Sequence, residues 1–263
     1  MANPRCQPMP HSRRRFLRAA AAHVLTLALS GVSLVACGEA RRPLDPLRTP
    51  AVSAPASTAQ STQDGEIQPL PAPSLSGTLS LEETVAARRS VRSYNSQTLT
   101  WQEIGQLLWA AQGITLDRSP SSPGLRSAPS AGALYPLETY VVTGEGSFHY
   151  LPADHALRSS PRLGLRQELW EAGLRQDWIR EAPAVFVLAA VYPRTEARYG
   201  GRAARYVHME AGHAAENLLL QAVALGLGGV VIGAFHDDQV QQVLELPEDH
   251  EPLYLIPVGH PKE

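Results

Sequence analysis

The spacing of apolar residues predicts several helices in the second part of the chain. Ser80 and Thr100 each open a Ser/Thr-x-x-Glu pattern, which is typical of a capping box at a helix start. Apolar residues then recur at helical spacing from Ile104 to Ala111, until Gly113 ends the second helix. The expected helices span residues 80–88, 100–113, 163–179 and 203–227, and one runs from Asp237 or Asp238 to 244.

Strands are predicted where apolar residues alternate with polar ones or follow one another without interruption. Residues 137–143 alternate, and residues 148–151 are the candidate to pair with them. Residues 184–191 are continuously apolar, as in a buried central strand. A short apolar piece covers residues 230–232, a last strand covers residues 253–258, and residues 117–130 are expected to be loop. This order predicts an α+β fold with the long helix at its centre.

The first 37 residues have the pattern of an export signal. Residues 12–18 have the sequence SRRRFLR, which matches the twin-arginine motif, and the apolar stretch after them is only a weak candidate for a permanent membrane helix. It ends at Leu34-Val35-Ala36-Cys37-Gly38, which resembles a lipobox whose cysteine is lipidated. An uncleaved anchor helix is the alternative. We expect export by the twin-arginine route to the cell envelope or periplasm, with membrane contact only through a lipid on Cys37.

Residues 38–78 differ from the rest of the chain in composition. They are rich in Pro, Ala, Ser, Thr and Gln and lack apolar periodicity, which predicts a flexible tether. A small ordered arm around a partner subunit is the alternative. The folded domain is then expected over residues 79–263, a length suited to one domain.

Charge and cysteine content exclude several kinds of site. The net charge is −2, and 18 basic against 25 acidic residues remain without the five arginines that precede Cys37, which gives −7 and no basic excess for nucleic acid. The two cysteines, Cys6 and Cys37, both lie in the N-terminal segment, so the folded part has no disulfide, thiolate chemistry or cysteine-based zinc site.

Common catalytic motifs are also missing. His208 and His213 are five residues apart, so they lie on different faces of a helix and do not form a His-Glu-x-x-His metal site. No serine-hydrolase elbow and no P-loop occurs, and the glycines at 226–229 follow a helix, whereas the dinucleotide fingerprint follows a strand. No metal site is expected.

A cluster of cations and hydroxyls follows the first predicted helix. Arg88, Arg89, Ser90 and Arg92 lie within five residues. Arginine presents a fixed fork of donors that suits phosphate, and serine adds shorter contacts. The same pattern is typical of a solvated charge run at a helix end, so the cluster alone leaves an anion site and a plain surface equally open.

Four segments taken together resemble the nitroreductase family of FMN enzymes, and within it the SagB-type dehydrogenases, which oxidise thiazoline and oxazoline peptides. The resemblance covers essentially residues 79–262. It is based on the segments Arg88–Arg92, Ala128–Pro136, Ala211–Asn217 with its continuation to Gly228, and Leu255–Pro261. It implies a central, mostly antiparallel sheet flanked by helices, and a long helix at the interface of a homodimer whose two chains share each flavin.

The resemblance also implies which residues bind FMN. Arg88, Arg89, Ser90 and Arg92 match the motif that reaches the phosphate, the ribityl chain and the pyrimidine edge. Small residues permit the close approach of a loop to the flat ring. The remaining matches are Pro129, Ser130 and Ala131 in that loop, Gly228 and Gly229 in the turn near flavin N5, and Lys262 as a phosphate ligand. A simple helix stop is the alternative for the glycines.

The family transfers hydride at flavin N5 in ping-pong fashion, and azoline oxidation also needs a base. A Lys-Tyr pair is thought to serve in azole-forming relatives, and Arg198-Tyr199 stands at the matching place. Arginine is a poor base, which leaves Tyr199 as the candidate catalytic residue, with loop packing as its alternative role. Glu216 also replaces the family's usual glutamine. Both departures weaken azole synthesis and leave flavin binding intact.

The sequence therefore predicts an exported FMN-dependent oxidoreductase with a small-molecule or peptide substrate that it does not identify. One alternative is a reductase of nitro or quinone-like acceptors. Another is a catalytically idle lipoprotein that uses the fold as a binding module. Because NAD(P)H is scarce outside the cytoplasm, an exported enzyme is expected to use another electron donor.

Overall fold

The computed structural model describes residues 65–116, 124–160 and 162–262, all of which belong to a unit that spans residues 60–263. The predicted signal segment, 1–37, and residues 38–64 of the predicted tether lie outside the described residues. Among the residues that are described, no helix has the length and apolar character needed to cross a bilayer.

A seven-stranded sheet forms the centre of the fold, and every neighbouring pair in it is antiparallel. The strand order is β1-β6-β5-β4-β7-β9-β8, and a separate two-stranded sheet pairs β2 with β3. The strands are β1 Ile67–Pro69, β2 Ile114–Leu116, β3 Leu125–Arg126, β4 Leu137–Thr143, β5 Gly146–Leu151, β6 Ala156–Ser160, β7 Ala184–Ala190, β8 Gly228–Gly229 and β9 Glu251–Gly259.

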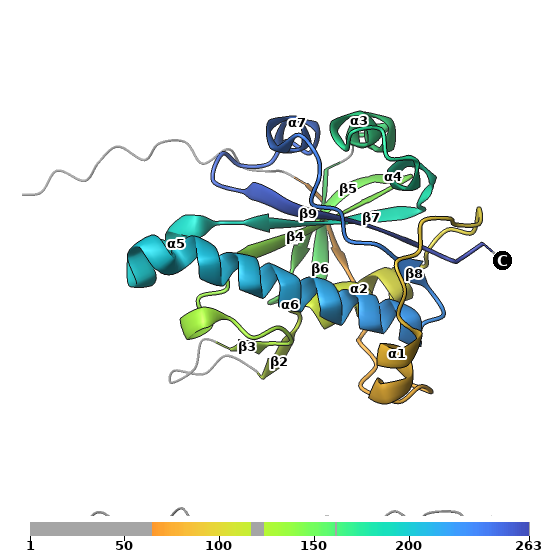
Figure 1. The fold of residues 1–263 in the computed structure, drawn as a ribbon, viewed down its shortest axis with the longest axis horizontal. Coiled ribbons are helices and arrows are strands. Elements are labelled where there is room, and N and C mark those ends of the chain that lie inside the picture. Colours follow the sequence, from red (N-terminus) through yellow and green to blue (C-terminus); the bar gives the residue numbers. More distant parts are fainter. Residues whose placement is uncertain (1–64, 117–123, 161, 263) are drawn as a thin grey trace, which may run out of the picture. The chain divides into compact units, whose positions relative to one another are not determined.

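Helices cover both faces of this sheet (Figure 1). The long α6 lies on one face with α1 and α2, and the other face carries α3, α4 and α7. The helices are α1 Leu81–Ala87, α2 Trp101–Gln112, α3 Leu165–Ala172, α4 Asp177–Glu181, α5 Tyr192–Tyr199, α6 Ala203–Ala224 and α7 Asp237–Val243. The α+β prediction of a mostly antiparallel sheet between helices is confirmed.

The central strand β7 explains why its sequence is apolar throughout. Phe186 and Leu188 face the core under α6, whereas Val185 and Val187 face the core under α3 and α7. All seven residues of β7 are fully buried, because both faces of the strand are covered.

Both predicted capping boxes are present. Ser80 Oγ accepts a hydrogen bond from the Glu83 amide at 3.1 Å, and the Glu83 carboxylate accepts one from the Ser80 amide at 2.7 Å. Thr100 and Glu103 make the same exchange at the start of α2. Each box satisfies backbone donors that a helix start otherwise leaves open, so the sequence fixes where these helices begin.

Several predicted boundaries are wrong. Residues 163–179 form two helices, because Leu174 and Arg175 adopt left-handed φ values of 58° and 56° and break the helix. Helix α7 is capped by His236 without a side-chain bond, so neither Asp237 nor Asp238 is the cap. The predicted loop 117–130 contains β3, and α5, β2 and β6 were not predicted at all.

The end of the predicted tether belongs to the folded domain. Strand β1 pairs with β6, with Ile67 opposite Arg158. Leu70 is only 8% exposed and packs into the core under α2 and α6. The segment shows no periodicity because β1 is only three residues long. Pro69 is tolerated there, because the outer side of an edge strand has no neighbouring strand that needs its missing N–H group.

Small residues on α6 serve the packing of the chain on itself. Ala211, Ala214 and Ala215 are at most 3% exposed and lie in the core between α6 and the sheet. These three residues are therefore not available for close packing against a second chain, whereas Gly212 of the same helix is partly exposed.

Candidate active site

The arginine segment leaves the end of α1 and runs beside β8. The Val91 amide donates to the Gly229 carbonyl at 3.0 Å, and Ser90 forms a parallel bridge with Gly229. A Cβ on Gly228 would lie 2.5 Å from Val91 Cγ2, closer than side chains pack. Glycine at 228 therefore permits the contact with Val91, and two motifs far apart in the sequence become neighbours.

The C-terminal segment joins the same group. The Lys262 amide donates to the Ser93 carbonyl at 3.1 Å, and the Asn95 amide donates to the His260 carbonyl at 3.0 Å. Beneath them the buried Tyr94 hydroxyl donates to the carbonyls of Val91 and Pro257, at 2.7 and 3.1 Å. Burial raises the pKa of Tyr94 well above its ordinary value, which keeps this brace protonated.

The cations of this group have few partners among the described residues. Arg88 Nε lies 3.7 Å from a Glu216 carboxylate oxygen, too far for a hydrogen bond, and Arg92 lies 5.6 Å from the centre of the Trp178 ring. Arg89 Nη1 donates to the carbonyls of Ala86 and Arg88, each at 2.8 Å, so it also caps the end of α1.

A second group forms around the loop 128–136. Gly132, Ala133 and Tyr135 have φ values of 65°, 53° and 47°, and for the two residues other than glycine this conformation is strained. Ser130 Oγ accepts a hydrogen bond from the Tyr135 amide at 2.9 Å, which closes the loop on itself. Pro129, Ser130 and Ala131 lie at the start of this turn, and Pro129 is exposed.

Helix α5 brings Tyr199 to that loop. A Cβ built on Gly132 would lie 2.9 Å from both the Tyr199 hydroxyl and Arg198 Nη1. The Tyr199 ring also packs edge-on against Tyr206 of α6, with ring centres 5.0 Å apart. Tyr199 is thus beside the predicted flavin loop, and the same contact fits its alternative role in packing.

Buried polar residues that the sequence did not single out support this loop. Arg126 Nη1 donates to Gln112 Oε1 at 2.8 Å and to the Leu137 carbonyl at 3.3 Å, and its guanidinium lies 4.8 Å from the centre of the Tyr135 ring. Glu210 of α6 is 2% exposed, and burial raises its pKa to about 7 against the opposing effects of Ser130 and Arg126.

The sequence did contain a signal for Glu210. Val207, Glu210, Ala211 and Ala214 follow the i, i+3, i+4, i+7 spacing of a buried helix face. A carboxyl group on such a face needs a specific partner, because an unpaired buried charge is costly.

Helix α6 connects the two groups of residues. Ser130 of the loop is close enough to Glu210 to lower its pKa, while Glu216 lies beside Arg88. Six residues of a helix rise by about 9 Å. One residue further, Asn217 Nδ2 donates to the Ser127 carbonyl at 3.3 Å, at the start of the same loop. Both groups therefore occupy neighbouring turns of one helix.

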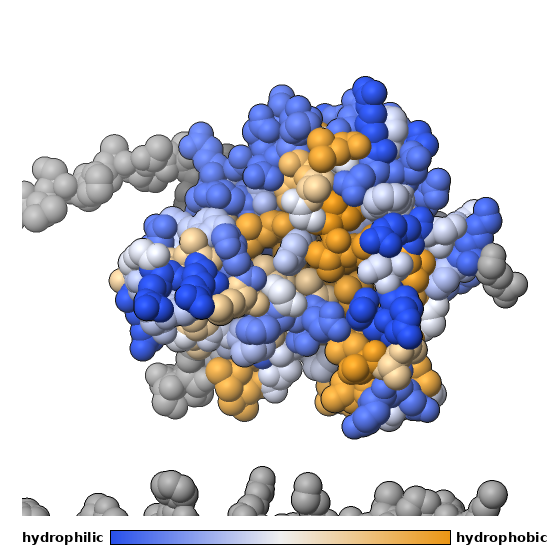
Figure 2. All heavy atoms as spheres, viewed as in Figure 1, coloured by the Kyte–Doolittle hydropathy of each residue, from blue (hydrophilic) through white to orange (hydrophobic). Residues whose placement is uncertain are grey.

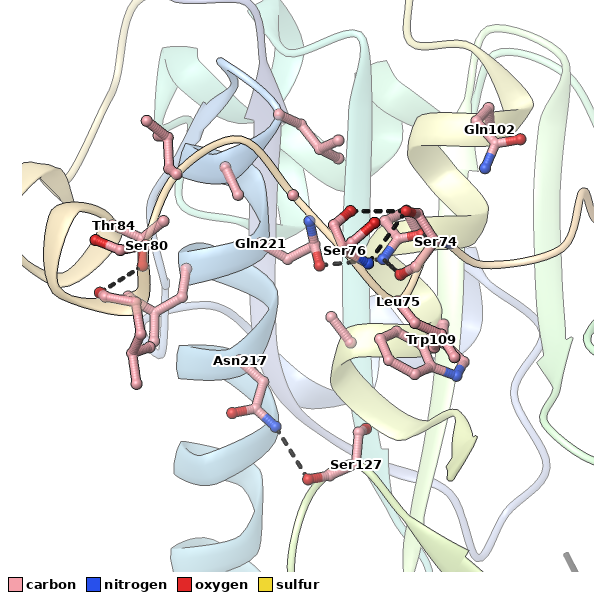
Figure 3. A pocket seen from close by; sticks show the side chains of 18 residues that line it. Ser74, Leu75, Ser76, Ser80, Thr84, Gln102, Trp109, Ser127, Asn217 and Gln221 are labelled. Atoms are coloured by element: carbon pink, nitrogen blue, oxygen red, sulfur yellow. Dashed lines mark hydrogen bonds between the residues drawn. The ribbon is translucent and has the colours of Figure 1, made fainter. Parts of the chain in front are cut away.

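A cavity of about 500 Å³ opens between α1, α2, α6 and the segment before α1 (Figure 3). Gln106 of α2 connects this helix to α6 and to the segment before α1. Its Nε2 donates to Gln221 Oε1 of α6 at 3.1 Å, and its Oε1 accepts from the Ser74 amide at 2.7 Å. Trp109 and Asn217 line the end near Ser127. No Asp, Glu, Lys, Arg or His is among the described residues that line this cavity.

The surface around the cavity is also apolar. Leu79, Leu81 and Val85, at and just before α1, are between 41% and 64% exposed. They contribute to the apolar surface at the α1 end of the view in Figure 2. Within the described residues, no group of three His, Cys, Asp or Glu side chains is arranged to hold a metal ion.

Comparison with known proteins identifies relatives over nearly the whole described region. The family model described as "Nitroreductase family" matches residues 85–260. A protein of Methanocaldococcus jannaschii that is named as a nitroreductase is 44% identical over 187 residues, which are 69% of this chain and 91% of that protein.

Two further matches extend this comparison. An enzyme of Bacillus subtilis named FMN reductase (NADPH) is 28% identical over 188 residues, 68% of this chain and 65% of that enzyme. A crystal structure from Ralstonia eutropha, also named as a nitroreductase, has a TM-score of 0.66 at 29% identity and covers 78% of this chain and 93% of its own.

Proposed function

Because the chain belongs to the nitroreductase family and is therefore an oxidoreductase, we propose that it works with FMN bound by the residues gathered at the ends of α1 and β9. The observation that carries this proposal is the junction of three distant motifs. Ser90 and Val91, between Arg88 and Arg92, lie against Gly228 and Gly229, and the backbone of Lys262 joins the same segment at Ser93. The name of the Bacillus subtilis relative supports the same cofactor.

The residues present fit a flavin phosphate. Arg88, Arg89, Arg92 and Lys262 place four cations at one edge of the sheet, and among the described residues their one ion pair is the long contact between Arg88 and Glu216. A phosphate with nearly two negative charges would be bound by these donors. Ser90 is exposed at the same edge and can donate to the ribityl chain.

Bound at this place, FMN would supply hydride transfer between two substrates that react in turn. The chain's own residues would bind its phosphate and present the backbone of residues 129–131 to the flat ring. Tyr199 lies beside that loop and is our candidate to hold or transfer a proton. Arg198 places a positive charge beside the same loop.

The cavity favours a second candidate function, the reduction of nitro or quinone-like acceptors. Its described lining offers amides, hydroxyls and one indole ring, with no ionisable group. A planar uncharged acceptor fits such a surface better than the diphosphate of a nicotinamide nucleotide, which needs cations. The SagB-type oxidation of azoline peptides stays a proposal of lower rank, because Arg198 stands in place of lysine.

The proposal includes a homodimer and export. Family members are typically dimers, and the apolar surface around Leu81 and Val85 is continuous with the cavity between α1 and α6. The twin-arginine and lipobox patterns in residues 12–38 support export in the folded state and a lipid on Cys37.

The absorption spectrum of the purified full chain tests the flavin. We expect bands near ~370 and ~450 nm that persist through gel filtration, and FMN in the supernatant after heating. The double substitution Arg88→Ala with Arg92→Ala should remove these bands, whereas Arg158→Ala, on β6 at the other side of the sheet, should keep them. If the purified chain is colourless and does not bind added FMN, the alternative of a catalytically idle binding module is favoured instead.

A further inference from the structure

A side chain of α5 holds the loop 128–136 from outside. Arg194, on the first turn of α5, donates from Nη1 to the Tyr135 carbonyl at 3.1 Å, and its Nη2 forms an ion pair with Glu138 Oε1. Two nitrogens of one guanidinium therefore hold two acceptors, one on the loop and one on β4. The planar fork of arginine suits such a bridge, whereas the single ammonium group of a lysine does not match it.

The partner of Arg194 on β4 is itself fixed in place. The side chain of Glu138 is 13% exposed, and its Oε2 lies 2.8 Å from His149 Nε2 of β5. Burial raises the pKa of Glu138, but its hydrogen bonds and electrostatic interactions with His149 and Arg194 outweigh burial and lower the pKa to about 2. The carboxylate is therefore ionised and accepts from one partner at each oxygen, which fixes the direction in which Arg194 extends.

The bond from Arg194 reaches a strained residue of the loop. Tyr135 is 9% exposed, and its φ of 47° lies in the left-handed region, which a tyrosine adopts only where neighbouring contacts impose it. Its amide donates to Ser130 Oγ at 2.9 Å, and its hydroxyl accepts from the Arg126 amide at 3.1 Å. Those two partners belong to the loop and to the strand that leads into it, whereas Arg194 ties Tyr135 to α5.

The same face of α5 also meets the start of the turn. Arg194 and Arg198 are four residues apart on the helix, so they lie on one face. Arg198 Nη1 and the Tyr199 hydroxyl each lie 2.9 Å from the position that a Cβ would take on Gly132. Helix α5 therefore contacts the loop at Gly132 and again at Tyr135, and it is a support for the shape of the loop.

We propose that Arg194 is a positioning residue: its bridge from Glu138 to the Tyr135 carbonyl keeps the loop 128–136 in the shape against which the flavin ring packs. The inference rests on the proposed function, because it assumes that the flavin lies along residues 129–131. Without the bridge, Tyr135 can leave its left-handed conformation, and the residues before it move as well. The flavin then has to restore the loop when it binds, which weakens its binding.

The substitution Arg194→Lys keeps the positive charge and removes the fork. Arg162→Lys is the matched control, because Arg162 also bridges a carboxylate and a backbone carbonyl, those of Glu168 at 2.6 Å and Val243 at 3.0 Å. The side chains of Arg162 and Arg194 are 38% and 39% exposed. The partners of Arg162 belong to α3 and α7, so the control lies on the sheet face opposite α6.

Binding of FMN and of riboflavin, which lacks the phosphate, separates the loop from the phosphate site. Fluorescence quenching by the full-length flavin-free protein gives both dissociation constants. We expect Arg194→Lys to weaken the binding of both flavins by the same factor, about tenfold, because the loop contacts the ring that they share. Arg88→Ala, at the proposed phosphate site, should weaken FMN more than riboflavin, and Arg162→Lys should change neither. A loss confined to FMN, or no loss, in Arg194→Lys would overturn the inference.

A double substitution tests whether Glu138 acts through Arg194. Glu138→Gln removes the charge that directs the guanidinium, so it should weaken both flavins in the wild-type background. In the Arg194→Lys background the bridge is already lost, and Glu138→Gln should have little further effect. Equal losses in the two backgrounds would show that Glu138 does not act through Arg194 and would overturn the bridge.

Hydrogen exchange of the Tyr135 amide, which donates to Ser130 within the loop, needs no flavin. In the flavin-free protein it should be faster in Arg194→Lys than in the wild type and unchanged in Arg162→Lys. Equal exchange in all three proteins would overturn the role of Arg194 in the loop. If neither flavin binds the wild type while the exchange differs, the proposed function fails and the positioning of the loop by Arg194 stands.

Discussion

At the scale of single residues, glycine 228 shows how one missing side chain joins two motifs. The arginine segment meets β8 at Val91, where no Cβ fits, and a helix stop therefore does not explain Gly228. The turn itself is made by Gly226, which follows α6 with a φ of 71°. Gly226 thus makes the turn after α6, whereas Gly228 permits the close contact with Val91.

We expect Gly228→Ala to destabilise the domain by roughly 2 kcal/mol, because the added methyl group overlaps the Val91 side chain near its Cβ, which cannot turn away. Urea unfolding measures the change. The control is Gly201→Ala, whose added Cβ would meet no atom within 4 Å. Equal unfolding midpoints for the two variants would show that Val91 does not pack closely against Gly228.

The raised pKa of Glu210 also predicts how stability depends on pH. Its folded-state pKa, about 7, exceeds the ordinary value of 4.5, so the protonated form is favoured by folding. This stabilisation is complete below about pH 4.5 and is lost as the pH rises to about 7, a change of roughly 3 kcal/mol relative to Glu210→Gln. Chemical unfolding of the flavin-free proteins at several pH values checks it, and parallel curves would contradict it.

At the scale of elements, strand β1 shows that the folded domain already includes residues 67–69. Periodicity could not reveal it, because a three-residue edge strand has too few positions to show a pattern, and its pairing partner β6 lies about 90 residues further along the chain. The element is recognised only by the strand that it pairs with and by the core that Leu70 enters.

Leu70→Ala should therefore lower the free energy of unfolding by roughly 2–4 kcal/mol, the usual cost of removing a buried leucine side chain. Leu163→Ala, at a residue that is 69% exposed, should leave it nearly unchanged. If the two substitutions prove equally harmless, residues 65–78 are a tether as their composition suggests.

At the scale of the whole molecule, the outward face of α6 is the place where we expect a second copy. Within the chain its small residues are used up by the core, so the contact must be made by side chains that α6 exposes, such as Met209, which is 48% exposed. A flavin shared between two chains makes cofactor binding depend on this contact.

Met209→Arg should convert the dimer to monomers in sedimentation experiments and lower flavin occupancy together with it. Leu163→Arg places the same charge near the start of α3, on the opposite side of the sheet, and should change neither property. Monomers that retain their full flavin content would contradict a shared site.

The export that we propose depends on the first residues of the chain. Cys37→Ser should abolish incorporation of labelled palmitate in a bacterial host and release the protein from the membrane fraction. Substituting both Arg13 and Arg14 with lysine should retain the protein in the cytoplasm. Continued lipid labelling of Cys37→Ser would show that the lipobox assignment is wrong.

Taken alone, the sequence determined the features that depend on neighbours along the chain. It predicted the two capping boxes, the buried strand β7 and the four family motifs, because each depends on residues that are close together along the chain. Tertiary structure alone decided the helix break at Leu174 and Arg175, strand β1, and the contact of Val91 with Gly228. These depend on groups that are distant in sequence, and only folding determines which of them meet.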